Sequence, residues 1–392
     1  MTRIIAVGAW VGLVVSLAVG SQWLQRVGAV QAGGATVQAP KFEVDPMWPK
    51  PLPNHWILGS AIGVWVDQQD HVWIIHRGAS TLDPNENGAG GKLTKECCSA
   101  APPVLEYDPG GKLVQSWGGP GQGFEWPQSN HGIFVETNGT VWIAGNGAQD
   151  GQLLKFTRDG KFLKQFGFGW ANAGSTDTFA FRQPAKIFVD EKNKTAYIAD
   201  GYGNKRVVVM DSETGAFKKV WGAYGNVPSD EDTGRYRPTA PPPQQFRNPV
   251  HCADLSNDRL LYVCDRQGNR LQVFTPEGKF IKEQWYARRS LGEGAVWDIA
   301  FSKDPAQRYI FLADGRNQKV RIIVRETLEE ITAFGDGGRQ PGQFFGVHSI
   351  ATDSKGNIYT TETYEGKRLQ KFVYKGIGPV RRGNQGVVWP TR

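Results

Sequence analysis

Three histidines are the residues of this sequence whose type and spacing suggest chemistry. The chain of 392 residues contains only six histidines. Three of them, His131, His251 and His348, each open one of three similar segments, HGIFVETNGTVWIAG, HCADLSNDRLLYVCDR and HSIATDSKGNIYTTE. Three imidazoles that leave one coordination position open form a ligand set of catalytic zinc. The sequence therefore predicts a zinc site, provided that the fold brings these side chains together.

The histidine segments belong to a unit that occurs six times. Each unit opens with an apolar strand, a turn rich in Asp, Asn and Gly, and a second strand, and two more strands follow. The openings span residues 61–78, 131–145, 185–201, 251–266, 297–315 and 348–362. Six units of four strands predict an all-β fold, a six-bladed β-propeller. Gly-rich and aromatic linkers such as GGPGQGFEWPQSN resemble those of NHL-repeat propellers.

The register of the repeat places the three histidines around one axis. Aligned on their turns, the openings have these residues at one position: Ile62, His131, Ala185, His251, Trp297 and His348. The first strand of each blade lines the central channel of a propeller, so alternate blades present imidazoles roughly 120° apart. A single histidine of this kind is more typical of a hydrogen-bonded core residue. The shared register of all three favours a metal site.

The N-terminal residues 1–32 have the pattern of an export signal. Arg3 precedes an apolar run that ends near Gly20, and small residues follow. The alternative is a retained membrane anchor, because the run approaches the roughly 20 residues that span a bilayer. Both interpretations predict an exported protein, periplasmic or extracellular, which contacts a membrane only if this segment is retained. The remaining expected parts are an extended arm over 33–59, the propeller over 60–375 and a C-terminal segment over 376–392 that is a candidate for closing the last blade.

Charge and cysteine content limit the partners and the compartment. The formal net charge is +7, and the cations are scattered along the chain, which argues against a nucleic-acid partner. Four cysteines, an even number, fit an oxidising compartment. Cys252 and Cys264 fall on the two arms of one predicted hairpin and are candidates for a disulfide. Cys97 and Cys98 form either a vicinal disulfide or two thiols.

Further segments resemble one particular family. IIHRG (74–78), ADGYGNKRV (199–207) and CDRQGNRLQVF (264–274) are similar to segments of the peptidyl-α-hydroxyglycine α-amidating lyases, which are six-bladed propellers with a three-histidine zinc site. The resemblance implies zinc binding by the three repeat histidines. It also implies catalytic roles for Arg77, Tyr202 and Arg266.

The chain departs from that family at several positions. Gly203 stands where the family has a half-cystine, so the corresponding disulfide is absent. Ser349 stands where the family has an aspartate that helps to bind a structural calcium ion. A Ca²⁺ site is therefore less favoured than zinc, although carbonyls near Val64 and Ile133 are available for it. The long loop 79–103, beside Arg77, also differs from the animal enzyme, and substrate choice is the property that depends most on it.

The implied reaction is cleavage of the N–C bond of an α-hydroxyglycine-type amide to an amide and glyoxylate. The substrate is then a small molecule or a peptide that carries a hydroxylated amide. Tyr202, as a phenolate, is the expected base, and Arg77 and Arg266 are suited to the substrate carboxylate and to developing negative charge. The alternative for the arginines is a structural tie between blades. The alternative for Tyr202 is a turn cap.

Two other functions compete with the lyase. A propeller fold by itself does not imply catalysis, so a non-catalytic NHL-repeat protein that binds a peptide, protein or glycan is one of them. A metal-dependent hydrolase or lactonase is the other, but in the alignment no set of Glu, Asp and Asn side chains of the kind that holds its usual calcium ion faces the channel. Asp200, Asp265 and Asp314 recur at equivalent blade positions. That recurrence predicts a role in loop hydrogen bonding and not in acid/base catalysis.

Overall fold

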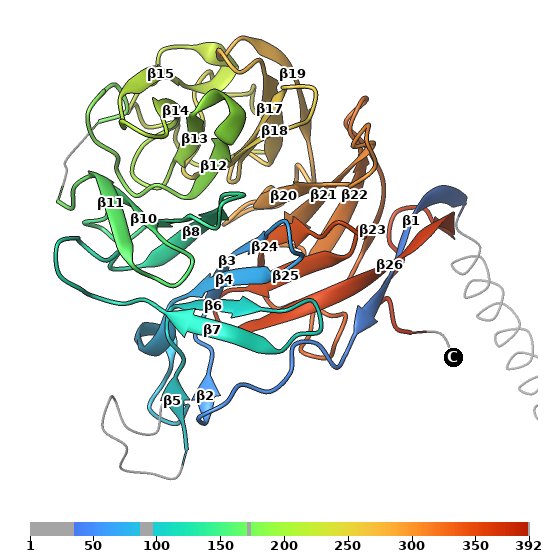
Figure 1. The fold of residues 1–392 in the computed structure, drawn as a ribbon. Coiled ribbons are helices and arrows are strands. Elements are labelled where there is room, and N and C mark those ends of the chain that lie inside the picture. Colours follow the sequence, from blue (N-terminus) through green and yellow to red (C-terminus); the bar gives the residue numbers. More distant parts are fainter. Residues whose placement is uncertain (1–34, 87–96, 171–173, 391–392) are drawn as a thin grey trace, which may run out of the picture.

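The strands of the chain form six four-stranded antiparallel sheets around a common axis, as the computed structural model shows (Figure 1). The structure describes residues 35–86, 97–170 and 174–390. Neighbouring sheets touch through their first strands, and the last sheet contacts the first, so the ring is closed. This arrangement confirms the predicted six-bladed β-propeller. The segment predicted as an export signal, 1–32, lies outside the described residues.

The blades follow one another along the chain. Blade 1 contains β3 (Ala61–Val66), β4 (Val72–His76), β6 (Val104–Tyr107) and β7 (Leu113–Trp117), and blade 2 contains β8 (Asn130–Val135), β9 (Val141–Gly145), β10 (Gln152–Phe156) and β11 (Phe162–Gly167). Blade 3 contains β12 (Lys186–Asp190), β13 (Thr195–Asp200), β14 (Arg206–Asp211) and β15 (Phe217–Trp221), and blade 4 contains β16 (Val250–Leu255), β17 (Leu261–Asp265), β18 (Arg270–Phe274) and β19 (Phe280–Trp285). Blade 5 contains β20 (Asp298–Phe301), β21 (Tyr309–Asp314), β22 (Lys319–Val324) and β23 (Glu329–Phe334), and blade 6 contains β24 (Val347–Thr352), β25 (Ile358–Glu362), β26 (Arg368–Arg381) and β1 (Thr36–Asp45). Beside blade 1, β2 (Trp56–Ile57) pairs in parallel with β5 (Ser99–Ala100).

Burial within each blade explains its sequence pattern. Inner strands such as β17, LYVCD, are buried at every position, because each sheet packs between two neighbouring sheets. Outer strands such as β19, FIKEQW, are only partly buried, which leaves the charged groups of Lys282 and Glu283 access to water. The described residues contain no helix that is long and apolar enough to cross a membrane.

The last blade is closed by the N-terminal strand. β1 pairs antiparallel with β26, and Figure 1 shows the blue β1 lying along the red β26. Phe42 and Val44 of β1 are buried, and the ring of Phe42 lies 5.4 Å from that of Phe334 in blade 5. The closing strand therefore comes from within the predicted arm 33–59. It does not come from the C-terminal segment 376–392, whose first residues only extend β26.

Buried ion pairs recur where the second strand of a blade ends. In blades 3 to 6 an acid at the end of the second strand pairs with an arginine at or near the start of the third, at 2.6 to 2.7 Å: Asp200 with Arg206, Asp265 with Arg270, Asp314 with Arg321 and Glu362 with Arg368. The Asp265 carboxylate also accepts the backbone N–H of Arg247. These acids hold loops and strands together, as their recurrence in the sequence predicts.

Replacing Asp265 by alanine is expected to lower the free energy of unfolding by about 3–5 kcal/mol, because the buried Arg270 guanidinium would lose its nearer carboxylate and keep only that of Glu283, at 3.5 Å. Denaturant unfolding followed by tryptophan fluorescence measures the change. Glu213→Ala is the control, since Glu213 and its partner Lys194 are both more than half exposed, and a change below about 1 kcal/mol is expected there. Equal stability of the two variants would contradict the role given to Asp265.

The cysteines are paired in the described structure. Cys252 of β16 stands directly opposite Cys264 of β17 in the hairpin, and the two form a disulfide with a Cα–Cα distance of 4.8 Å. Cys97 and Cys98 are also joined to each other. Both disulfides fit an oxidising compartment.

Candidate metal centre

The imidazoles of His131, His251 and His348 meet on the propeller axis. Each histidine is the second residue of the first strand of its blade, in β8, β16 and β24. Their ring centroids lie 4.8 to 5.0 Å apart, and one nitrogen of each lies within 4.8 Å of the others. All three side chains are buried. The structure thus brings together the three histidines that the sequence singles out.

Nδ1, the other ring nitrogen of each histidine, is hydrogen-bonded to a backbone carbonyl oxygen of the next blade. Nδ1 of His131 lies 2.7 Å from the carbonyl oxygen of Ala185, and Nδ1 of His348 lies 3.0 Å from that of Ile62. Nδ1 of His251 is hydrogen-bonded in the same way to the carbonyl oxygen of Trp297. Ala185, Ile62 and Trp297 are the residues at the aligned position in blades 3, 1 and 5. A carbonyl only accepts, so Nδ1 carries the proton and Nε2 presents its lone pair to the axis.

These lone pairs fit a metal ion. The Tyr202 hydroxyl lies 3.0 Å from Nε2 of His131 and 3.0 Å from Nε2 of His251. It has a single proton to donate, so among the described residues at least two of the three imidazole acceptors lack a donor. Burial, the neighbouring His348 and the Arg77 guanidinium hold the pKa of His131 well below its usual range. Three neutral, buried imidazole acceptors around one point are the donor set that zinc prefers.

Tyr202 and Arg266 lie directly beside the histidines. Tyr202 follows β13 and Arg266 follows β17, so each residue stands just after the end of the second strand of its blade. Arg266 donates from Nη1 to the Tyr202 hydroxyl at 3.0 Å, and its guanidinium lies 4.5 Å from the centroid of the Trp297 ring. Its Nη2 pairs with Glu293, whereas its buried Nε has no acceptor in the described part of the chain. A buried guanidinium with a free donor is suited to an anionic ligand.

Arg77 has structural bonds at the rim of the same site. Its Nη2 donates to the side-chain oxygen of Asn146 at 2.9 Å, and its Nε donates to the carbonyl of Asn130 at 3.3 Å. These bonds tie blade 1 to blade 2. Burial lowers the pKa of Arg77, while the nearby Tyr202 acts in the opposite direction. Arg77 therefore links blades 1 and 2, which is the structural role given above as its alternative, and it also adds positive charge near Tyr202.

Asn146 and Tyr364 also lie near the site and were not predicted from the sequence. Asn146 follows β9 directly, as Arg77 follows β4. Tyr364 stands two residues after β25, as Tyr202 stands two residues after β13, and its ring lies 6.3 Å from that of Trp297. An alignment of the ends of the second strands would have found both positions.

Calcium does not fit the channel as zinc does. A cavity of about 10 Å³ beside the histidines is lined by Val64, Ile133 and Ser349, together with Lys186 and Asp298. Ser349 supplies no carboxylate, and the carboxylate of Asp298 is paired with the Lys186 ammonium at 2.5 Å. Asp298 is the only acidic residue among the described residues that line this cavity, so the cavity offers Ca²⁺ no unpaired carboxylate.

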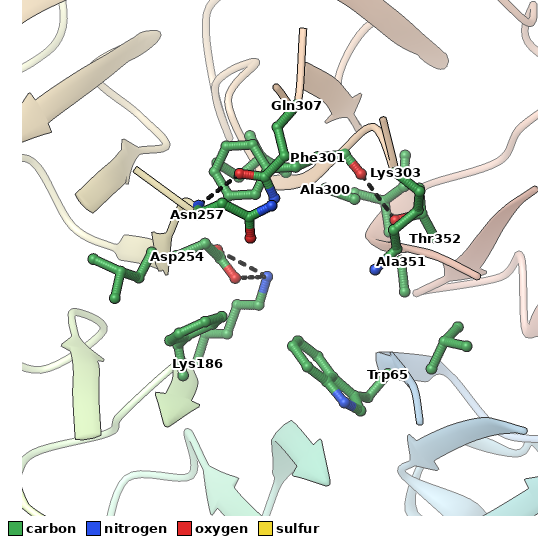
Figure 2. Close-up of a pocket in the computed structure, with 15 residues that line it drawn as sticks. Trp65, Lys186, Asp254, Asn257, Ala300, Phe301, Lys303, Gln307, Ala351 and Thr352 are labelled. Atoms are coloured by element: carbon green, nitrogen blue, oxygen red, sulfur yellow. Dashed lines mark hydrogen bonds and ion pairs between the residues drawn. The ribbon is translucent and has the colours of Figure 1, made fainter. Parts of the chain in front are cut away.

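A larger cavity of about 240 Å³ lies in contact with Lys186 and Asp254 (Figure 2). Its walls include Trp65, Phe188 and Phe301. None of the three axial histidines lines it, and Lys186 lines both this cavity and the small one beside the histidines. Lys186 therefore marks the boundary between the histidine site and the larger cavity.

The chain is similar to amidating enzymes and to an NHL-repeat protein at low identity. It is 27% identical over 238 residues to mouse peptidyl-glycine alpha-amidating monooxygenase, a match that covers 59% of this chain and 22% of that protein. The chain thus spans about a fifth of the length of that relative. Mouse NHL repeat-containing protein 3 is 24% identical over 357 residues, covering 86% of this chain and 85% of that protein. A probable peptidyl-alpha-hydroxyglycine alpha-amidating lyase of Caenorhabditis elegans is 23% identical over 219 residues, 56% of each chain.

These relatives confirm the resemblance predicted from the sequence. No family model matches the chain. Among solved structures, a protein of unknown function from Bacteroides thetaiotaomicron is similar with a TM-score of 0.51 at 14% identity, covering 86% of this chain and 77% of that chain. At that identity the likeness concerns the fold alone.

Proposed function

We propose that this protein is a zinc-dependent carbon-nitrogen lyase that cleaves an α-hydroxyglycine-type amide to an amide and glyoxylate. The observation that carries the proposal is the convergence of three neutral imidazole nitrogens with the Tyr202 hydroxyl, which Arg266 contacts in turn. Similarity to amidating proteins, including one named as a probable lyase, supports the same reaction class.

His131, His251 and His348 would hold the zinc ion. When bound there, zinc would supply Lewis-acid stabilisation of negative charge on the substrate hydroxyl oxygen. The three Nδ1 hydrogen bonds to backbone carbonyls keep the imidazole rings oriented and their Nε2 atoms unprotonated. The protein therefore needs no rearrangement of its tautomers to bind a metal.

Tyr202 is the proposed base. Its oxygen accepts the proton of the substrate hydroxyl, the carbon-oxygen double bond of glyoxylate forms, and the carbon-nitrogen bond breaks with its electron pair on nitrogen. The same proton then neutralises the departing amide nitrogen. The reaction consumes neither water nor an oxidant. The Arg266 N–H that lies 3.0 Å from the Tyr202 oxygen stabilises its phenolate form.

Arg266 and Arg77 are proposed to bind the carboxylate of the substrate. Arg266 has a free Nε donor, and its Nη2 can exchange Glu293, which is 45% exposed, for a substrate carboxylate. Arg77 supplies further positive charge, because its guanidinium also interacts electrostatically with Tyr202. The proposed substrate is a small molecule or a peptide with a hydroxylated amide, and no nucleic-acid partner is proposed.

An exported location, periplasmic or extracellular, is part of the same proposal. It is supported by the disulfide between Cys252 and Cys264 and by the signal-like pattern of residues 1–32. Contact with a membrane would require that this segment is retained.

The test combines metal analysis with product analysis. We expect about one zinc ion per chain by elemental mass spectrometry, as one three-histidine site requires. We also expect glyoxylate and benzamide in equal amounts from α-hydroxyhippurate. A protein that stays folded, binds no zinc when it is added and releases no glyoxylate would overturn the proposal and favour a non-catalytic binding propeller.

A further inference from the structure

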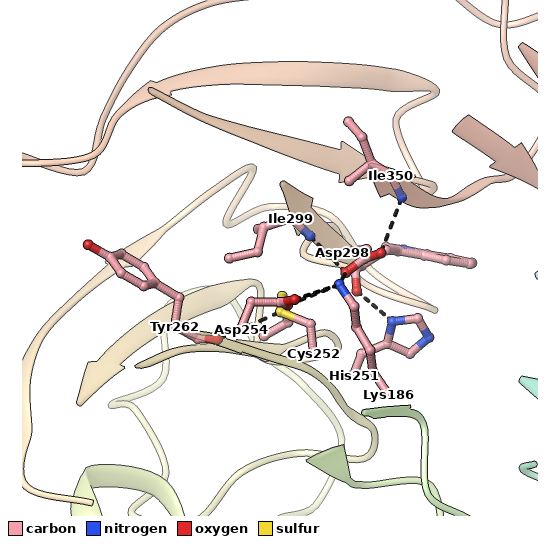
Figure 3. The surroundings of a disulfide bond; sticks show 10 residues. Lys186, His251, Cys252, Asp254, Tyr262, Asp298, Ile299 and Ile350 are labelled. Atoms are coloured by element: carbon pink, nitrogen blue, oxygen red, sulfur yellow. Dashed lines mark hydrogen bonds and ion pairs between the residues drawn. A yellow bond between two sulfur atoms is a disulfide. The ribbon is translucent and has the colours of Figure 1, made fainter. Parts of the chain in front are cut away.

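Three charged side chains form a buried cluster beside the histidines. Lys186, Asp254 and Asp298 lie on the first strands of blades 3, 4 and 5, and each is at most 9% exposed. Figure 3 shows the Lys186 ammonium between the two carboxylates, with His251 next to the cluster. Charged groups are expensive to bury, so their presence on the channel axis calls for a function.

The two carboxylates of the cluster are bonded differently. The Lys186 ammonium lies 3.0 Å from Asp254 and 2.5 Å from Asp298. Asp298 also accepts the backbone N–H of Ile350, at 3.2 Å, whereas Asp254 has no hydrogen-bond donor other than Lys186 among the described residues. Asp298 therefore links Lys186 to the backbone of β24, whereas Asp254 is hydrogen-bonded to Lys186 alone among the described residues.

The bonds of Asp298 reach the backbone segments whose carbonyls orient His251 and His131. Asp298 directly follows Trp297, whose carbonyl accepts the Nδ1 proton of His251. Lys186 directly follows Ala185, whose carbonyl accepts the Nδ1 proton of His131.

The third link runs through β24. Ile350, whose amide is bonded to Asp298, stands two residues after His348 on this strand. One carboxylate thus joins the starts of β12 and β20 to β24.

We propose that Asp298 is a positioning residue of the metal site, which sets the affinity for zinc by fixing the backbones that hold the three imidazoles. The inference rests on the proposed zinc site and adds a residue that touches neither metal nor substrate. Groups that orient metal ligands in this indirect way typically change metal affinity 10–100-fold when they are replaced. A competing explanation is purely electrostatic, since the cluster carries one positive and two negative groups and its negative charge attracts any cation.

Two isosteric variants separate position from charge. Asp298→Asn and Asp254→Asn each remove one negative charge and each leave Lys186 paired with one remaining aspartate. Only Asp298→Asn weakens the link between β12, β20 and β24. We expect about a 10–100-fold loss of zinc affinity for Asp298→Asn and less than about a 3-fold loss for Asp254→Asn, measured by competition with a chromophoric chelator.

Two further measurements keep the inference testable if Asp298→Asn folds poorly. Asp298→Glu retains the charge but displaces the carboxylate, so it too is expected to weaken zinc binding. Cobalt(II) in place of zinc reports on ligand geometry, and we expect its visible absorption bands to change in both Asp298 variants and not in Asp254→Asn.

Equal losses of affinity in Asp298→Asn and Asp254→Asn, or full affinity in Asp298→Glu, would overturn the positioning role in favour of simple charge. Unchanged affinity in every variant would overturn it as well. A wild-type protein without zinc affinity would be a different result, because it would remove the proposed function itself.

Discussion

Replacing His251 by alanine is expected to remove bound zinc and to lower the rate of glyoxylate release by about three orders of magnitude or more. The variant takes away one of three converging imidazoles and leaves the site with two. Lewis-acid stabilisation of the developing charge is worth several kcal/mol, and each 1.36 kcal/mol corresponds to a tenfold change in rate. Elemental mass spectrometry and a glyoxylate assay measure the two effects on the same preparation.

His71→Ala is the matched control for that variant. His71 lies with Asp67 and Glu106 in another group of side chains that could hold a cation, and its Nδ1 is 2.6 Å from Glu106. Arg158 already pairs with both carboxylates, so we expect this group to hold no zinc and the control to keep its metal and its activity. Zinc retained in His251→Ala and lost in His71→Ala would indicate that the metal binds at the His71 group and not on the propeller axis.

Replacing Tyr202 by phenylalanine is expected to lower the rate by about 10²–10⁴-fold while zinc remains bound, because a general base contributes to this extent. Phenylalanine keeps the ring that packs 5.0 Å from His131 and removes only the hydroxyl. Among the described residues, this hydroxyl is the one group within hydrogen-bond distance of both His131 and His251, and it is the proposed base. Steady-state kinetics and metal content together measure the outcome.

Tyr224→Phe controls for the loss of a tyrosine hydroxyl elsewhere in the propeller. The Tyr224 hydroxyl is bonded to Glu283 and Arg270, away from the axial histidines. We expect its removal to leave the rate within about twofold, since it touches none of the groups assigned to the reaction. If Tyr202→Phe retained the wild-type rate, Tyr202 would be a packing residue and another base would have to be sought.

The candidate site shows how far a repeat can be used to predict tertiary contacts. The alignment of the openings puts His131, His251 and His348 at one position, and the structure brings them together on the axis. The same alignment contains Ala185 and Trp297, whose carbonyls orient two of the histidines. Equivalent residues of a closed ring are related by rotation about its axis, so one register determines many contacts at once.

Contacts outside the repeat were not predictable in this way. The strand over Thr36–Asp45 pairs with β26, more than 300 positions later in the chain. Its apolar residues identify it as a strand but do not identify its partner, because any open sheet edge offers the same backbone groups. The C-terminal segment 376–392 was an equally reasonable candidate until the pairing was known.

The sequence by itself determined the propeller, its six blades and the histidine register, because these follow from local patterns that recur with each blade. Tertiary structure alone decided the closing strand, the tautomers of the histidines and the link from Lys186 to Asp298, which are 112 residues apart. Such contacts depend on side chains that are not repeated from blade to blade, and on the angle between neighbouring blades. A charge buried on the channel axis becomes recognisable only when the neighbours that stabilise it are known.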